Sequence, residues 1–253
     1  MTGKHCKAVV TSRRDVNSSL WVLRLAPEQK VSFQPGQYVT LGLPGQQRMI
    51  ERPYSLVSSP REPELEFFLE LVQDGQLTPN LYTVPVGGLV FMRPSAKGHF
   101  LFDRQSGRRN HLMVCTVTGV APFLSMLRDF SAAEKEGSAF PYRIAVLQSG
   151  SLALELGYLE ELTRYAHEHS WLHYIPSVSR IWLDSSWKGE VGRAEDVVRK
   201  HMDSHGFTSA DTTAYMCGNP NMIINVKGIL ERAGFTKEGM REEKYWVEAE
   251  KGA

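Results

Sequence analysis

The chain has 253 residues, which suits two domains of ordinary size and is too long for one small core. Its 29 basic and 28 acidic side chains nearly cancel, so nucleic acid is not expected as a partner. The three cysteines, Cys6, Cys115 and Cys217, form no C-x-x-C pair, which argues against a metal site or a disulfide framework and fits a reducing, intracellular setting.

The sequence carries no signal for a membrane. No run approaches the length that spans a bilayer, and residues 1–7 are charged without an apolar stretch behind them. We therefore expect a cytoplasmic protein with no membrane association, present as a monomer.

The first hundred residues predict an antiparallel β-barrel. From Lys7 to about Asp103, short segments rich in Val, Leu, Phe and Tyr are separated by turn residues at roughly 8- to 12-residue spacing. A short helix is expected after Leu77, with Thr78 as its N-cap and Pro79 at its first position, and such a terminus favours phosphate. The expected strands are 8–10, 20–25, 38–43, 54–57, 65–72 and 89–92.

A polar, basic stretch at residues 104–110 is expected to link this first domain, residues 1–103, to a second domain at residues 111–246 with a tail to 253. In the second domain strands alternate with helices, which predicts a parallel α/β sheet covered on both faces. Ligands of such sheets bind outside the carboxyl ends of the strands. The expected strands are 111–117, 142–148, 172–178 and 214–217, and the expected helices are 122–136, 155–169, 193–202 and 220–233.

The stretch Arg52-Pro53-Tyr54-Ser55 has the side chains that a phosphorylated aromatic ligand needs. A guanidinium binds pyrophosphate oxygens, a phenol ring lies against a flat heterocycle, and a hydroxyl bonds a ring nitrogen. Pro53 keeps the backbone extended. Taken alone, these four residues would equally suit an ordinary edge strand.

Three motifs in register carry a resemblance to a known family. Arg52-Pro53-Tyr54-Ser55, the stretch Thr118-Gly119-Val120-Ala121-Pro122-Phe123-Leu124, and Met216-Cys217-Gly218-Asn219-Pro220 resemble the short bacterial branch of the ferredoxin-NADP(+) reductase family. The similarity runs from about residue 7 to Trp246. It implies a barrel that binds FAD, an α/β domain that binds NADP(H), hydride transfer between the two, and single electrons passed between FAD and ferredoxin or flavodoxin.

The resemblance also implies roles for residues. Arg52 would bind the pyrophosphate and Tyr54 would lie against the flavin, while Ser55 and Cys217 would lie at the reacting atoms. Cys217 is not expected to be a covalent nucleophile, because no histidine is placed to activate it; inert packing is the alternative. The implied FAD set is Arg52, Pro53, Tyr54, Ser55, Leu69, Gln76, Leu77, Thr78, Thr118, Tyr245 and Trp246. The implied NADP set is Gly119, Ser151, Ser179, Arg180, Arg193, Cys217 and Gly218.

The chain departs from the family pattern at some positions. Val117 stands where another glycine is usual, and Ser151 where a third arginine is usual. Because Arg180 and Arg193 are present, we expect the protein to prefer NADPH over NADH, with weaker discrimination than a site with three arginines. The alternative is that both arginines are plain surface charges. Seven residues follow the aromatic pair Tyr245-Trp246, which would either gate the flavin or only anchor the terminus.

Two other functions stay open. A flavin reductase component of an oxygenase system would have the same two domains and a different acceptor. A non-enzymatic flavin- or nucleotide-binding module would keep the fold without the turnover.

Overall fold

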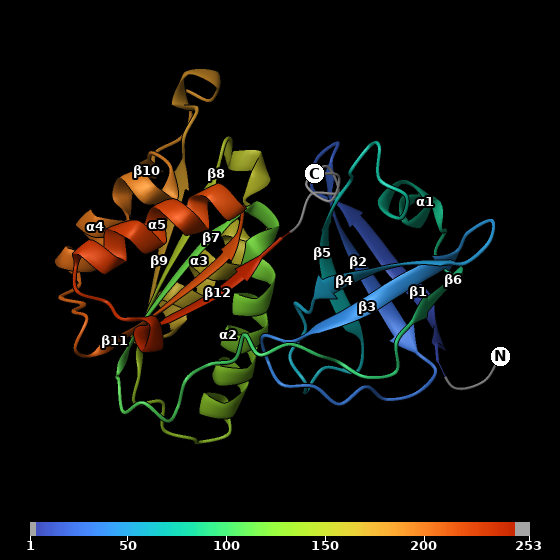
Figure 1. Ribbon diagram of the computed structural model, residues 1–253, viewed down its shortest axis with the longest axis horizontal. Coiled ribbons are helices and arrows are strands. Elements are labelled where there is room, and N and C mark those ends of the chain that lie inside the picture. The colour runs from blue at the N-terminus through green and yellow to red at the C-terminus, as the bar shows by residue number, and fades with distance from the viewer. Residues whose placement is uncertain (1–3, 246–253) are drawn as a thin grey trace. The chain divides into compact units, whose positions relative to one another are not determined.

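The computed structural model describes residues 4–245, which group into two compact units (Figure 1). The first unit runs to Phe102 and also takes in Ala121–Ala133, the greater part of helix α2 (Ala121–Lys135). The second unit consists of Asp103–Val120 and the chain from Glu134 onward.

The first unit is a six-stranded antiparallel sheet in the order β4-β3-β6-β1-β2-β5. The sheet curls on itself, since the Val57 amide, just after β4, donates to the Glu66 carbonyl of β5 at 2.8 Å. Alternate side chains point inward and form one apolar core. The prediction of an antiparallel barrel is confirmed. The elements are β1 (Cys6–Asp15), β2 (Leu20–Pro27), β3 (Tyr38–Pro44), β4 (Met49–Ser55), β5 (Leu65–Glu70), α1 (Thr78–Thr83) and β6 (Leu89–Met92).

Several local predictions in this unit differ from the structure. Strand β1 runs over Cys6–Asp15 and not only 8–10, and β5 ends at Glu70 and not at Val72. Strand β4 ends at Ser55 instead of continuing to Val57, because the Val57 amide leaves β3 and donates to the Glu66 carbonyl of β5. Thr78 is the first residue of α1 and not its N-cap, which is Leu77 without a side-chain hydrogen bond. The Thr78 hydroxyl instead accepts a hydrogen bond from the Val72 amide at 3.0 Å.

The second unit is a six-stranded parallel sheet in the order β10-β9-β8-β7-β11-β12. The chain builds outward from β7 to β10 and then returns to the other side of β7 with β11, so the strand order reverses between β7 and β11. Helices α4 and α5 lie over one face of this sheet, and their buried residues share one core with the strands (Figure 1). The prediction of a parallel α/β domain is confirmed.

The elements of this second part of the chain alternate as the sequence indicates. They are β7 (Asn110–Thr116), the 3-10 turn η1 (Val117–Val120), β8 (Arg143–Gly150), the turn η2 (Ala153–Glu155), α3 (Leu159–Glu168), β9 (Leu172–Val178), the turn η3 (Ile181–Leu183), β10 (Glu190–Val191), α4 (Ala194–Ser204), β11 (Thr212–Gly218), α5 (Pro220–Arg232), the turn η4 (Lys237–Gly239) and β12 (Met240–Lys244). Strands β10 and β12 are additional to the predicted set. The third helix starts at Leu159 and not at Glu155, because Glu155 ends a separate turn, η2.

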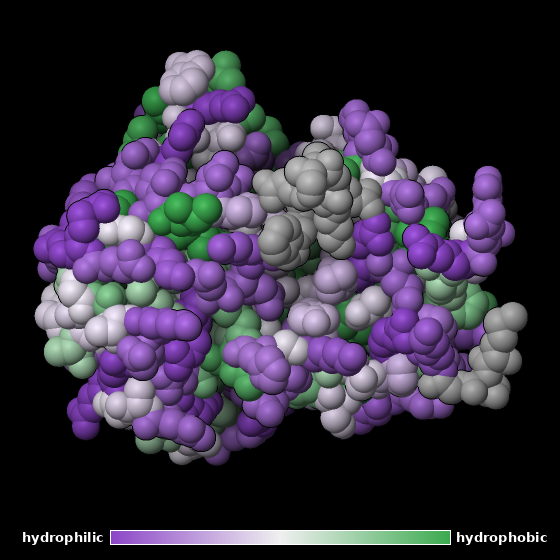
Figure 2. Space-filling model, viewed as in Figure 1, coloured by the Kyte–Doolittle hydropathy of each residue, from purple (hydrophilic) through white to green (hydrophobic). Residues whose placement is uncertain are grey.

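Polar side chains cover most of the face seen in Figure 2, and the apolar residues there lie in small separate areas. Among the described residues, no helix has both the length and the apolar character to cross a bilayer.

Candidate functional site

Strand β4 presents a guanidinium and a phenol on one face of the barrel unit. Arg52 and Tyr54 are two residues apart on an extended strand, so their side chains leave it on the same side. The Tyr54 ring packs against the barrel core, and burial raises the pKa of its phenol to about 12 although the Arg52 charge acts in the other direction. The phenol therefore stays neutral. Ser55, next along the strand, is buried.

The other residues expected around FAD in this unit offer mainly backbone groups. The Leu69 and Leu77 side chains are buried in the apolar interior. The Thr78 hydroxyl is engaged with Val72, and the Gln76 carbonyl accepts from the Asn80 side chain at 3.0 Å. These positions suit the backbone contacts that the resemblance implies, and their role stays a prediction.

In the second unit, the turn η1 lies directly against the end of β11. A Cβ atom on Gly119 would come within 2.3 Å of the Cys217 carbonyl oxygen, so only glycine allows this approach. Gly218 has a positive φ of 118°, and a Cβ there would lie 2.5 Å from the Thr116 hydroxyl oxygen. The Asn219 amide donates to the same hydroxyl at 2.9 Å. The structure thus brings the two predicted coenzyme motifs together, at the position where the strand order reverses.

Two polar residues that the sequence reasoning missed support this turn. Gln148 is fully buried on β8 and donates to the Val117 carbonyl at 3.5 Å. Tyr174 on β9 donates its hydroxyl proton to the Gln148 side-chain oxygen at 2.7 Å. The available signal was a glutamine inside an otherwise apolar strand, since a buried amide needs a partner.

Cys217 is buried beneath the turn, and its thiol is held neutral. Burial raises the thiol pKa well above its ordinary value, the Glu243 charge raises it further, and a hydrogen bond with Tyr245 opposes both. Since a thiolate is the nucleophilic form of cysteine, this supports the expectation that Cys217 forms no covalent bond with substrate.

Tyr245 belongs to the same group of residues. Its amide donates to the Gly218 carbonyl at 3.1 Å, and its hydroxyl donates to the Thr118 carbonyl at 3.4 Å. Strand β12 places it, because Lys244 pairs in register with Gly218. Its expected position over FAD stays a prediction, and its expected partner Trp246 lies outside the described residues.

The residues expected around a 2'-phosphate directly follow the carboxyl ends of strands β8, β9 and β10. The Ser179 amide donates to the Gly150 carbonyl and the Arg180 amide to the Ser151 carbonyl, both at 3.0 Å. These bonds hold the ends of β8 and β9 side by side. The Arg180 side chain is exposed.

Arg193 follows strand β10, the neighbour of β9 in the sheet. The Gly192 amide donates to the Val178 carbonyl at 2.9 Å, which places Arg193 beside the end of β9 with its side chain exposed. Ser151 has no guanidinium to offer where the third arginine is usual, and its amide donates to a Glu155 carboxylate oxygen at 2.6 Å. The role of Arg180 and Arg193 at a 2'-phosphate stays a prediction.

The two halves of the chain match two family models. The Oxidoreductase FAD-binding domain covers residues 7–102, and the Oxidoreductase NAD-binding domain covers residues 113–228. The residues fit these ligands, since a partly exposed arginine and a tyrosine lie on one strand face, and glycines let the turn η1 and the end of β11 approach each other closely.

Curated relatives match nearly the whole chain. The Ferredoxin--NADP reductase of Pseudomonas aeruginosa is 28% identical over 232 residues, 86% of each chain. The Flavodoxin/ferredoxin--NADP reductase of Rhodobacter capsulatus is 27% identical over 243 residues, covering 92% of this chain and 88% of that protein. The reductase component DmpP of phenol 2-monooxygenase, from a Pseudomonas species, is 28% identical over 86% of this chain and 59% of its own.

A solved structure confirms the fold. A ferredoxin NADP+ reductase from Neisseria gonorrhoeae, with bound FAD and NADP, superposes with a TM-score of 0.85 over 96% of this chain and 100% of that one, at 21% identity.

Proposed function

Because the chain belongs to the ferredoxin-NADP(+) reductase family, we propose that it transfers hydride between NADP(H) and FAD and exchanges single electrons with ferredoxin or flavodoxin. The observation that carries the proposal is the close approach of Gly119 to Cys217. It joins the two coenzyme motifs at the strand reversal, in a chain whose other half matches a FAD-binding domain. The protein is an oxidoreductase that works in the cytoplasm.

When bound, FAD and NADP(H) supply the chemistry, since nicotinamide carries hydride and flavin can pass on electrons one at a time. The chain binds the two rings and orients them. Arg52 neutralises pyrophosphate, the neutral Tyr54 phenol provides a flat surface for the flavin, and Ser55 offers its hydroxyl to the ring nitrogen. The protonated Cys217 thiol lines the nicotinamide position without competing as a nucleophile. The hydride step needs no general base.

Arg180 and Arg193 hold the 2'-phosphate and set the preference for NADPH. A charge-assisted hydrogen bond contributes about 1.5 to 3 kcal/mol, so replacing Arg180 by Ala should lower the kcat/KM ratio of NADPH to NADH roughly tenfold or more. Steady-state kinetics with both coenzymes measures this ratio. Arg164→Ala is the matched control, because Arg164 is an exposed arginine paired with Glu168 on α3. An unchanged ratio in Arg180→Ala would remove Arg180 from the coenzyme site.

A reductase component that serves an oxygenase is the second candidate, and the similarity to DmpP favours it. The three cysteines here are free and buried and form no cluster motif, so they do not provide the ligands of an iron–sulfur cluster. Turnover with NADPH and purified ferredoxin or flavodoxin separates the two. Rapid reduction of either carrier supports the first proposal, and turnover only with an oxygenase component supports the second.

A further inference from the structure

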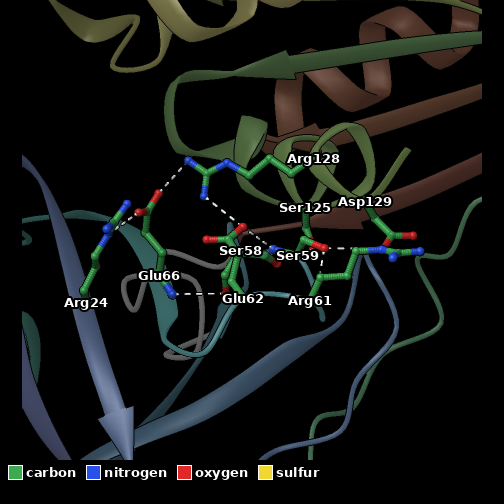
Figure 3. Close-up of polar contacts among 9 residues, drawn as sticks. All are labelled: Arg24, Ser58, Ser59, Arg61, Glu62, Glu66, Ser125, Arg128 and Asp129. Atoms are coloured by element: carbon green, nitrogen blue, oxygen red, sulfur yellow. Dashed lines mark hydrogen bonds and ion pairs between the residues drawn. The ribbon is translucent and has the colours of Figure 1, made fainter. Parts of the chain in front are cut away.

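Helix α2 is joined to the barrel unit by polar contacts along one of its faces (Figure 3). The Ser125 hydroxyl donates to the Ser58 carbonyl at 2.7 Å. The Asp129 carboxylate accepts from the Arg61 guanidinium at 2.9 Å and from the Ser59 hydroxyl at 3.3 Å. Ser58 and Ser59 follow the FAD strand β4 within four residues. The helix is therefore bonded to the segment that leaves the flavin motif.

The strongest of these contacts is an ion pair buried between α2 and β5. The Glu66 side chain is 3% exposed and accepts from the Arg128 guanidinium at 2.9 Å and from the Arg24 guanidinium at 2.6 Å. The Arg128 side chain is 11% exposed and also lies 3.5 Å from the Glu62 carboxylate. A buried carboxylate requires such partners, because water no longer solvates it.

These contacts fix the direction of the helix more tightly than apolar packing alone. Ser125, Arg128 and Asp129 stand three and four residues apart, on a single face of α2. Phe123 contacts Phe100 and Phe130 contacts Phe102. These ring contacts bury apolar surface of α2, but they permit small shifts of the helix along its neighbours. The guanidinium of Arg128 bonds only at defined distances and angles, and so selects one setting of the helix.

The chain connects this fixed helix directly to the coenzyme turn. The turn η1 ends at Val120, and α2 begins at Ala121. Resting on the function proposed above, we propose that Arg128, through its ion pair with Glu66, is a positioning residue for hydride transfer. It fixes α2 on the barrel unit, and this helix begins directly after the turn η1 that carries Thr118-Gly119.

The test uses the FAD-loaded full chain and compares Arg128→Met with the wild type. Stopped-flow reduction of the flavin by NADPH gives the limiting rate, calorimetry gives the affinity for NADP+, and hydrogen exchange reports protection of the amides of residues 121–133. We expect a limiting rate lower by on the order of ten- to a hundredfold, because small misplacements of reacting atoms have effects of that size. Affinity for NADP+ should change by less than about threefold, since the coenzyme's own contacts remain. Protection in α2 should fall.

Rescue and control variants separate positioning from general damage. Arg128→Lys keeps the charge and should recover most of the rate. The double variant Glu66→Gln with Arg128→Met also removes the buried carboxylate charge, which Arg128→Met leaves paired with Arg24, and it should remain slow. Arg199→Met, at an exposed pair with Asp203 on α4, should behave as wild type in all three measurements.

Several outcomes would overturn the proposal. A wild-type limiting rate in Arg128→Met would do so. An equal fall in the limiting rate and in the affinity for NADP+ would also do so, as would a wild-type limiting rate in the double variant. If Arg128→Met does not fold, the double variant Glu66→Gln with Arg128→Met decides, and a wild-type limiting rate in it would reject the idea. A wild-type protein that NADPH does not reduce would instead reject the proposed function, which is a separate result.

Discussion

Val117 shows how one residue can depart from a family pattern at an energetic cost. Its φ is 45°, in the left-handed region, and it is the one non-glycine residue with a positive φ in the described part of the chain. A β-branched side chain is strained in this region. The resemblance identifies the missing glycine here, but only the backbone geometry gives the reason that glycine is usual.

Replacing Val117 by Gly should stabilise the protein slightly. Relief of the left-handed strain is worth about 1 to 2 kcal/mol, and the added freedom of the unfolded chain takes back about 0.5 to 1 kcal/mol. The midpoint of thermal unfolding should rise by roughly 1 to 4 °C. Calorimetry measures this midpoint. Val191→Gly, at an exposed valine of strand β10, is the control and should lower it; a drop in Val117→Gly as large as in the control would contradict the strain argument.

At the residue scale, short motifs in the sequence indicated Gly119, Cys217 and Gly218 as neighbours. Their contact depends on a close approach of two backbone segments. Only glycine permits such an approach, so a glycine in the sequence indicates it. Gln148 and Tyr174 could not be found in this way, because their role depends on which strand lies beside which, and spacing along the chain does not record that.

At the element scale, the regular strands and helices followed from periodicity, and the exceptions have local causes. Strand β12 has the sequence Met-Arg-Glu-Glu-Lys, which lacks apolar alternation, and it forms by parallel backbone pairing with the edge of β11. Strand β4 includes the charged Glu51, which is satisfied by the Arg93 guanidinium at 2.6 Å. In both cases a partner elsewhere in the chain stabilises the strand, and the local sequence does not show that partner.

The residue that follows α4 and a residue of β9 bring two histidine rings into contact. His173 and His205 stack with centroids 4.4 Å apart. The His173 pKa is lowered by burial and then by the Arg143 charge. The His205 pKa is lowered by burial and then by the charges of His173, His201 and Arg143. Both rings are therefore neutral in the folded protein at neutral pH.

This contact should make stability depend on pH. The unfolded chain takes up protons at an ordinary histidine pKa of about 6.5, whereas the folded rings resist protonation, so stability is full above that pH and is lost as the pH falls below it. Urea unfolding between pH 8 and pH 5.5 should show this fall.

Variants of the histidines test the cause of the fall. The double variant His173→Gln with His205→Gln should reduce the slope and leave the part due to His111, whose pKa burial lowers to about 4. The control His167→Gln, at an exposed histidine of α3, should keep the wild-type slope. An unchanged slope in the double variant would show that other groups cause it.

At the scale of the whole molecule, the sequence was sufficient for a barrel followed by a parallel α/β sheet. Turn spacing predicts the first, and alternation of strand and helix predicts the second. The grouping of α2 with the barrel unit was not predictable. Seven consecutive residues, 121–127, are buried, so the helix has no solvent face over these turns and its periodicity does not reveal its neighbours.

The proposed function depends most on bound flavin that NADPH can reduce, and anaerobic absorbance spectroscopy of the purified protein tests this directly. We expect a yellow protein, either as purified or after incubation with FAD, whose visible absorbance bleaches when NADPH is added and returns when ferredoxin or flavodoxin is supplied. A folded protein that stays colourless in the presence of FAD, or a yellow one that NADPH leaves unbleached, would contradict it.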